Sequence, residues 1–334
     1  MRICLLGEFD VELDEAMRKT AFYLHRYLSE EHDVLGLNPR NIISFRFWKD
    51  LKEFNPSYVH YVSGSSLISF IILKIVSVFT GSRSIISMMR PTFSKISLKM
   101  IKLFRPDVVI VQSPETEKKF EDLNFRTVFL PIVGMDFDRF HPSLKKRRDV
   151  LRKRFKLDTD DFLVLHVGSI KEGRNINWLL DLQEMDGVQV LIVGAVSQGL
   201  DKNLLNRLKE AGCTVFNSYF ENVEEIYALS DCYAFPVVPK ENFMGKSGAD
   251  CIDMPLSVLE AMSCNLPVVS TKFGGLTRIF SEGDGLIFAD DIEEFMEAVK
   301  YFKESDARIE TRKKVEMYSW AQIAGRIENV YREA

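Results

Sequence analysis

The sequence lacks the cysteine patterns of secreted or zinc-binding proteins. Its 334 residues include five cysteines, an odd number, and no CxxC pair. We therefore expect reduced thiols, as in a cytosolic protein. No group of histidine, cysteine and carboxylate residues has the spacing of a metal site, so we expect no bound metal. Repeats and low-complexity segments are absent as well.

Long apolar runs and targeting signals are also missing. The apolar run 67–79 is shorter than the roughly 18 residues of a membrane-spanning helix and contains Lys74. We expect it to pack in the core. The first residues, MRICLLGEFD, predict a strand rather than a signal peptide, which favours a cytoplasmic location. A net charge of −4 gives no general attraction to nucleic acid.

The common glycine-rich nucleotide motifs are absent. The first βα loop contains Gly7 but no GxGxxG, which argues against a dinucleotide-binding fold there. The tripeptide GKS at 245–247 lacks the preceding glycine that a P-loop requires, because Lys240 stands at that position.

Acidic residues are absent between positions 54 and 106. The same stretch holds seven basic residues: Lys74, Arg83, Arg90, Lys95, Lys99, Lys102 and Arg105. Three of the lysines share one face of a predicted helix at 95–104, and apolar residues form another face. A basic amphipathic helix is typical of surfaces that contact membranes or anionic ligands. The basic region 83–105 is therefore a candidate for peripheral membrane contact, with a solvated face on a core-packed helix as the alternative.

Short β-runs alternate with helical stretches along the chain. The predicted strands are 2–7, 33–37, 58–62, 84–88, 107–112 and 126–130, then 162–167, 188–193, 213–216, 232–236, 267–271 and 285–288. This alternation predicts two α/β domains with parallel sheets. The basic run 144–155 predicts a linker, with the domain boundary near residue 150. We expect a site in the cleft between the domains, at the carboxyl ends of the strands.

Residues 250–275 carry the strongest local signal. Asp253 and Pro255 predict the start of a helix over 256–264. A buried strand is predicted to follow at 267–271.

One face of this helix suits a nucleotide. Asp253, Ser257 and Glu260 share that face, and Glu260 points back toward the amino end. The free amides of residues 256–258 suit a phosphate, and a carboxylate suits the hydroxyls of a ribose. The alternative is a core helix that contains an incidental glutamate.

The segment 166–182 predicts a second anion-binding element. Its strand ends at Gly168, and a short loop carries Lys171 and Arg174 before Asn175 starts a helix. An arginine at the carboxyl end of a strand can hold a diphosphate through two parallel hydrogen bonds. A solvated loop arginine is the alternative.

These segments together resemble the retaining glycosyltransferases of family 4, which have the GT-B fold, and the similarity covers nearly the whole chain. The four segments that carry it are 134–142, 167–175, 255–275 and 318–331. The resemblance implies an α/β chain with two Rossmann-like domains facing across a cleft. The implied divisions are 1–150 for the acceptor, 151–316 for the nucleotide sugar, and 317–334 as a closing helix that packs back on the first domain.

The resemblance also implies roles for individual residues. Arg174, Glu260 and Asp253 are the candidate catalytic residues, with Glu260 on the ribose and Arg174 on the diphosphate. The expected donor-binding residues are Gly168, Ser169, Lys171, Tyr219, Phe220, Leu256 and Ser257. Gly7 and His60 are expected on the acceptor and sugar side, with an ordinary core histidine as the alternative for His60.

Three positions depart from the family pattern. Ile252 stands where the motif has its first glutamate, and Ser169 stands where an arginine usually follows the strand glycine. Lys171, Lys240 or Lys246 would have to supply the missing cation. The first loop, VELDEAM at 11–17, lacks the usual pair of glycines.

The implied function is that of a retaining, metal-independent hexosyltransferase without a cofactor. It would move a sugar from a UDP- or GDP-sugar to a glycan or lipid-linked acceptor. Two alternatives remain: a non-catalytic partner subunit that binds nucleotide sugars, and a nucleotide-sugar epimerase of the same fold.

Overall fold

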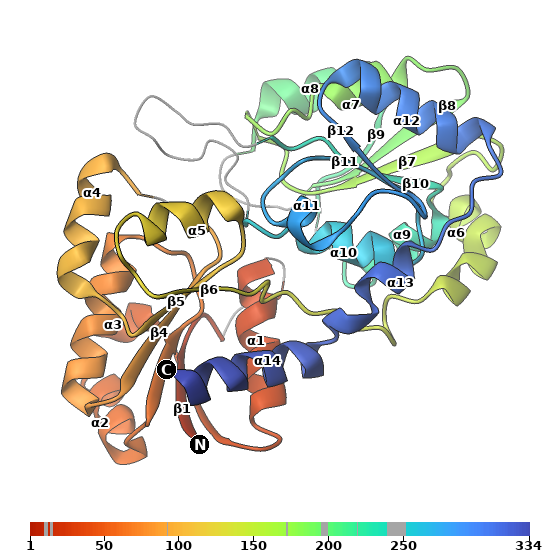
Figure 1. The fold of residues 1–334 in the computed structure, drawn as a ribbon. Coiled ribbons are helices and arrows are strands. Elements are labelled where there is room, and N and C mark those ends of the chain that lie inside the picture. The colour runs from red at the N-terminus through yellow and green to blue at the C-terminus, as the bar shows by residue number, and fades with distance from the viewer. Residues whose placement is uncertain are drawn as a thin grey trace.

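The computed structural model contains two α/β domains, each built on a six-stranded parallel sheet (Figure 1). It describes residues 1–9, 13, 16–91, 93–171, 173–194, 200–218, 220–238 and 252–334. The predicted fold class is confirmed. Helices cover both faces of each sheet, and the strands are correspondingly rich in buried apolar residues.

The N-terminal domain has the strand order β2-β1-β3-β4-β5-β6. Its strands are β1 (Arg2–Leu6), β2 (Asp33–Leu37), β3 (Tyr58–Tyr61), β4 (Arg83–Met88), β5 (Val108–Val111) and β6 (Thr127–Phe129). Its helices are α1 (Ala16–Leu28), α2 (Phe45–Phe54), α3 (Leu67–Thr80), α4 (Lys95–Met100) and α5 (Pro114–Glu121), with 3-10 turns at Pro39–Asn41 and Ile101–Phe104. Helix α1 covers one face of the sheet, and α2 to α4 cover the other (Figure 1).

The second domain has the strand order β12-β11-β10-β7-β8-β9. Its strands are β7 (Phe162–Val167), β8 (Val188–Val193), β9 (Thr214–Phe216), β10 (Cys232–Phe235), β11 (Val268–Thr271) and β12 (Leu286–Ala289). Its helices are α6 (Arg148–Arg154), α7 (Trp178–Gln183), α8 (Lys202–Glu210), α9 (Val223–Leu229), α10 (Leu256–Ser263), α11 (Leu276–Ile279), α12 (Ile292–Glu304) and α13 (Thr311–Val315), with 3-10 turns at Pro142–Arg147 and Glu316–Tyr318.

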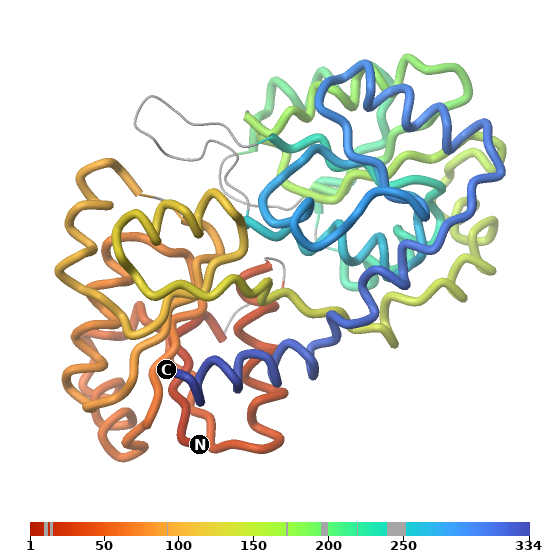
Figure 2. Tube along the Cα trace, in the orientation of Figure 1, coloured from red at the N-terminus to blue at the C-terminus, as the bar shows by residue number. Residues whose placement is uncertain are grey.

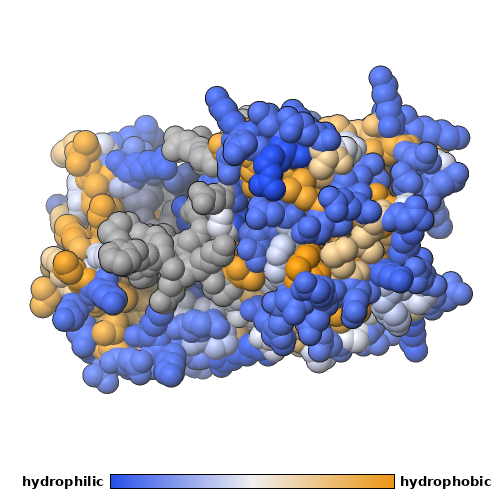
Figure 3. Space-filling view, turned by 90° about the horizontal axis from the view of Figure 1, so that it is seen from above, coloured by the Kyte–Doolittle hydropathy of each residue, from blue (hydrophilic) through white to orange (hydrophobic). Residues whose placement is uncertain are grey.

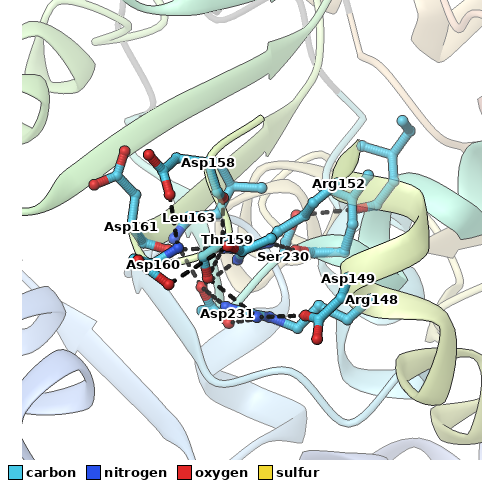
Figure 4. A network of polar contacts seen from close by, with 12 residues as sticks. Arg148, Asp149, Arg152, Asp158, Thr159, Asp160, Asp161, Leu163, Ser230 and Asp231 are labelled. Atoms are coloured by element: carbon cyan, nitrogen blue, oxygen red, sulfur yellow. Dashed lines mark hydrogen bonds and ion pairs between the residues drawn. The ribbon is translucent and has the colours of Figure 1, made fainter. Parts of the chain in front are cut away.

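The basic run 144–155 belongs to the second domain in this structure, although its composition suggests a linker. It forms the Pro142–Arg147 turn and α6, which both pack on α9. Arg152 is fully buried and donates to Asp231 at 2.5 Å and to the carbonyl of Leu229 at 2.8 Å (Figure 4). The prediction of a linker from the basic composition is therefore wrong for this run. Two of its arginines, Arg148 and Arg152, pair with the same aspartate, Asp231, and fix the run to the second domain.

The chain crosses between the domains twice, and the two crossings lie side by side (Figure 2). The first runs through 131–141, and the second leads from the 3-10 turn into the last helix, α14 (Trp320–Glu333). The amide of Met135 donates to the carbonyl of Tyr318 at 2.7 Å. A side chain on Gly134 would collide with the Trp320 ring, since an added Cβ would lie 2.4 Å from it.

Helix α14 packs on the N-terminal domain against α1. A capping box at Ser319 starts it, with the Ser319 hydroxyl accepting from the Gln322 amide. Its Tyr331 hydroxyl lies 2.7 Å from Nδ1 of His60, and Tyr23 of α1 stacks on Trp320. The chain thus leaves the second domain and ends in a helix, α14, that packs on the first domain.

The apolar run 67–79 forms α3 and is only partly a core helix. Phe70, Leu73 and Val76 are buried, but Ile68, Val78 and other residues of the same helix are exposed. No helix among the described residues is long and apolar enough to cross a membrane.

Candidate functional site

The carboxyl ends of β7 and β10 bring two of the predicted segments together. These strands are neighbours, but the sheet continues from β7 to β8 on one side and from β10 to β11 on the other. Ligands of open α/β sheets bind in the crevice outside such a reversal of strand order. The loop 168–174 follows β7, and α10 follows β10 along the chain, so both segments flank this crevice.

Glu260 lies just over one turn into α10 and is 4% exposed. The Tyr227 hydroxyl donates to one of its carboxylate oxygens at 2.8 Å. Lys19 of α1 donates to the other, also at 2.8 Å. Burial and the neighbouring carboxylate raise the pKa of Tyr227 well above its ordinary value, so this hydroxyl keeps its proton. Glu260 is therefore held from both domains.

A small pocket between the domains opens beside this carboxylate. Its lining comes from Leu13, which precedes α1, and from α1, the first crossing, α10 and α14: Lys19, Tyr23, Gly134, Met135, Asp136, Arg139, Phe140, Leu256, Glu260 and Trp320. Glu260 thus faces the space between the domains rather than the interior of its own sheet. Sequence analysis missed Lys19 because it belongs to no motif and lies 241 residues away.

The loop after β7 holds the predicted diphosphate residues. Arg174 is 7% exposed, and Ser169 and Lys171 are half-buried. A Cβ on Gly168 would lie 3.0 Å from Nε2 of His166 and 3.6 Å from a guanidinium nitrogen of Arg174. Glycine therefore leaves room for both side chains at the end of the strand.

His166 is a residue of this site that the sequence did not single out. Its Nδ1 lies 2.9 Å from the carbonyl of Ala234 on β10. Burial lowers the pKa of His166 to about 4; the charge of Arg174 contributes to this shift, and the hydrogen bond with Ala234 opposes it. The ring is neutral at pH 7, so Nδ1 carries the proton that Ala234 accepts and Nε2 keeps its lone pair beside Gly168.

Asp253 lies before α10 as predicted, but its carboxylate contacts the other domain. It accepts from Ser113 at 2.8 Å and from Thr116 at 2.6 Å, both at the start of α5. Its amide donates to the carbonyl of Met89 at 2.9 Å. Burial raises the pKa of Asp253 to about 6, although the two hydroxyl donors lower it. In this structure Asp253 joins the domains.

Gly274 and Gly275, which follow β11, lie where other segments of the backbone approach too closely for a side chain. A Cβ on Gly274 would lie 1.9 Å from the carbonyl oxygen of Asp253. A Cβ on Gly275 would lie 2.1 Å from that of Gln112 in the N-terminal domain. Gly274 also has a φ of +55°, which favours glycine. The pair allows the second domain to approach the first.

The remaining predicted residues lie at several places. Gly7 follows β1 directly, and an added Cβ would lie 2.9 Å from Cβ of Ala21 in α1. His60 is fully buried between Tyr331 and Ser87, with Nε2 2.6 Å from the Ser87 hydroxyl. His60 therefore lies outside the pocket, and the core-histidine alternative is the one that the structure matches. Burial lowers its pKa to about 3.

The predicted donor-binding residues also lie at several places in the structure. Leu256 lines the pocket, and the Ser257 carbonyl accepts from Tyr227 at 3.4 Å. Phe220 packs on Phe216, with ring centroids 5.2 Å apart. Ile252, in place of a glutamate, is buried. Tyr219, Lys240 and Lys246 lie outside the described residues.

One group of side chains among the described residues could surround a metal ion. It consists of Glu31, His32 and Glu328, where α14 meets the turn before β2. None of the three lines the pocket beside Glu260.

Comparison with known proteins adds an independent observation. The sequence profile of the glycosyl transferases group 1 family matches residues 161–304. The matched region contains Arg174, Asp253 and Glu260. The sequence resemblance to a glycosyltransferase is confirmed at the level of this family.

Curated relatives extend the match toward the N-terminus. The chain is 26% identical over 226 residues to D-inositol 3-phosphate glycosyltransferase of Paenarthrobacter aurescens, covering 60% of this chain and 50% of the relative. It is 24% identical over 245 residues to mannosylfructose-phosphate synthase of Agrobacterium fabrum, covering 65% and 51%. The chain thus aligns with about half the length of these relatives.

Solved structures share the entire fold. HepE of Anabaena, crystallised with UDP and glucose, superposes with a TM-score of 0.75 at 14% identity, covering 100% of both chains. Sucrose-phosphate synthase of Thermosynechococcus elongatus gives a TM-score of 0.80 at 15% identity, covering 100% of this chain and 99% of the other. The chain has the GT-B fold of these proteins, and the region that matches the group 1 profile lies in its second half.

Proposed function

We propose that this protein is a retaining family 4 glycosyltransferase. It moves a sugar from a UDP- or GDP-sugar to a glycan or lipid-linked acceptor. The observation that carries the proposal is the position of Glu260, near the amino end of α10 and between the domains. Glu260 is linked through Tyr227 and Tyr233 to Val167, at the end of the strand that precedes the Arg174 loop. The group 1 match over 161–304 supports the reaction class, and relatives solved with UDP and UDP-glucose favour a UDP-sugar.

The proposed chemistry rests on stabilising the departing diphosphate. Arg174 and the amides of Leu256 and Ser257 at the start of α10 supply positive charge where negative charge develops, and the helix dipole adds to it. The Val258 amide, also expected to be free, donates to the carbonyl of Pro255 at 3.2 Å. Glu260 binds the ribose hydroxyls. Because Lys19 holds Glu260 in this structure, donor binding has to rearrange that ion pair. We assign no protein base; a leaving phosphate oxygen takes the proton of the incoming hydroxyl. No metal is required.

The experiment combines binding and turnover for two variants. Thermal shifts with UDP-glucose and other UDP-, GDP- and ADP-sugars identify the donor, since a ligand that binds only the folded state stabilises it. Donor hydrolysis is then measured for Glu260→Gln and Arg174→Ala. We expect the first to weaken nucleotide binding about ten-fold or more, and the second to lower the rate by about a hundred-fold. Unchanged binding and rate in both variants would contradict the assignments.

One observation favours a second candidate, a non-catalytic partner subunit. Ile252 is buried where the family has a glutamate, and Ser169 replaces an arginine in the diphosphate loop. A partner subunit would bind nucleotide sugars without any turnover. The epimerase alternative would convert its donor without an acceptor, which NMR of the sugar nucleotide detects.

A further inference from the structure

The N-terminal domain has an exposed apolar surface on α3 and α4. Ile68, Ile75 and Phe79 follow one stripe of α3, and all three are exposed. Ile96 of α4 and Leu103 of the adjoining 3-10 turn are 73% and 74% exposed. We call these five residues the α3–α4 surface. Figure 3 shows hydrophobic side chains gathered along the outer edge of the domain, at the left of the view.

Packing within the chain accounts for only part of this surface, since the Phe79 ring contacts Trp48 of α2 with ring centroids 4.9 Å apart. Helix α3 buries its opposite stripe against the sheet, whereas α4 buries none of its residues. Helix α3 contacts both α4 and the 3-10 turn that follows it. Isolated exposed apolar residues are ordinary in globular proteins, but a contiguous group marks an interaction surface.

Lysines surround the surface without acidic counterparts. Lys74, Lys95, Lys99 and Lys102 are all exposed. None of them forms an ion pair with a carboxylate of the described residues, and positions 54–106 contain no acidic residue. A surface of this charge complements an anionic partner, although the whole chain has a net charge of −4.

We propose that the α3–α4 surface docks on an anionic lipid bilayer. The five apolar side chains enter the boundary between headgroups and acyl chains, and the lysines contact lipid phosphates. A free phosphate or a nucleic acid would use the lysines but would leave the apolar side chains in water, so a bilayer fits both features. The inference concerns binding alone and does not depend on the proposed sugar transfer.

The test is co-sedimentation with vesicles in the absence of any donor. At low salt, we expect the protein to bind phosphatidylcholine vesicles that contain phosphatidylglycerol at least about ten-fold more tightly than pure phosphatidylcholine vesicles. Combined Lys95→Gln, Lys99→Gln and Lys102→Gln substitutions should weaken anionic binding at least about ten-fold. Ile96→Ser with Leu103→Ser should weaken binding about five-fold, at low and at high salt alike.

Matched variants on the second domain are the controls. Lys202→Gln with Lys209→Gln on α8, and Val150→Ser on α6, alter exposed residues and should bind like wild type. Equal melting curves show that all variants are folded. The proposal is overturned by absent vesicle binding, by equal binding to neutral vesicles, or by equal losses in the controls. Self-association that Ile96→Ser with Leu103→Ser abolishes would assign the surface to a second copy instead.

Discussion

At the scale of single residues, charged groups that are buried define the site and its stability. The side chain of Glu260 is 5% exposed, and its carboxylate contacts the Lys19 ammonium and the Tyr227 hydroxyl. Removing one partner of a buried ion pair leaves the other charge without compensation, which costs more than the pair itself contributes.

Lys19→Met tests this dependence. The substitution keeps a long apolar side chain but removes the cation, and we expect the free energy of unfolding to fall by about 2 kcal/mol. Urea unfolding measures this change. Lys49→Met provides the control, because the Lys49–Glu53 pair is largely exposed and such pairs contribute little. Equal stability losses in the two variants would contradict the account.

At the scale of secondary-structure elements, α6 contains one fully buried guanidinium, that of Arg152. Arg152 bonds Asp231 and several backbone carbonyls, and Asp231 also accepts from the amide of Leu163 at the start of β7 (Figure 4). The helix is therefore attached to the second sheet by charge and hydrogen bonding as well as by Leu151.

We expect Arg152→Met to lower the free energy of unfolding by about 3 kcal/mol or more, because Asp231 would keep a charge without its buried partner. Chemical denaturation followed by circular dichroism measures the loss. Lys153→Met changes the next residue of the same helix, which is exposed, and should alter stability by less than about 0.5 kcal/mol. A loss of similar size in both would point to helix propensity rather than to the buried pair.

The strands of both sheets were predictable within one or two residues, because parallel strands buried on both faces appear as short apolar runs. The packing of α6 on the second domain was not predictable, because a run of basic residues has the same composition in a linker and in a helix whose arginines pair with a buried aspartate. The exposed stripe of α3 was also missed. Its apolar residues occupy both faces, so periodicity could not assign one to solvent.

The candidate site was predictable in part for a related reason. Glu260 and Arg174 stand in local patterns with a physical meaning, at a helix start and after a strand. Lys19 and His166 depend on the tertiary fold, which no local pattern reports. Asp253 was placed correctly along the chain, but its partners Ser113 and Thr116 lie in the other domain.

At the scale of the whole molecule, the two domains meet through polar contacts outside the crossings. Asp253 bonds the start of α5, and Arg278 of α11 pairs with Glu117 of the same helix. The Arg278 guanidinium also lies 3.7 Å from the centre of the Phe129 ring. Helix α5 is thus the main docking element of the first domain for the loops after β10 and β11.

Asp253 gives this contact a pH dependence. Burial raises its pKa to about 6 from an ordinary value of 3.8, so the folded protein binds more protons than the unfolded chain between these pH values. The free energy of unfolding therefore falls as pH rises from about 4 to about 6 through this group. We expect Asp253→Asn to remove this part of the slope and to raise stability at pH 7 by about 1–3 kcal/mol.

Urea unfolding at several pH values, compared between wild type and Asp253→Asn, checks this expectation. The difference between the two proteins isolates the titration of the one carboxyl group. Asp253→Ala also removes the titration but loses the oxygen that accepts from Ser113 and Thr116, so it should be less stable than Asp253→Asn. Parallel pH profiles for wild type and Asp253→Asn would contradict the account.

The paired crossings at Met135 and Tyr318 restrict how one domain can move against the other. Because the two crossing segments are hydrogen-bonded to each other, we expect the domains to rotate about this point as a hinge rather than to slide past each other. Gly134 lies at this hinge against Trp320, so a side chain added at position 134 would change the angle between the two domains.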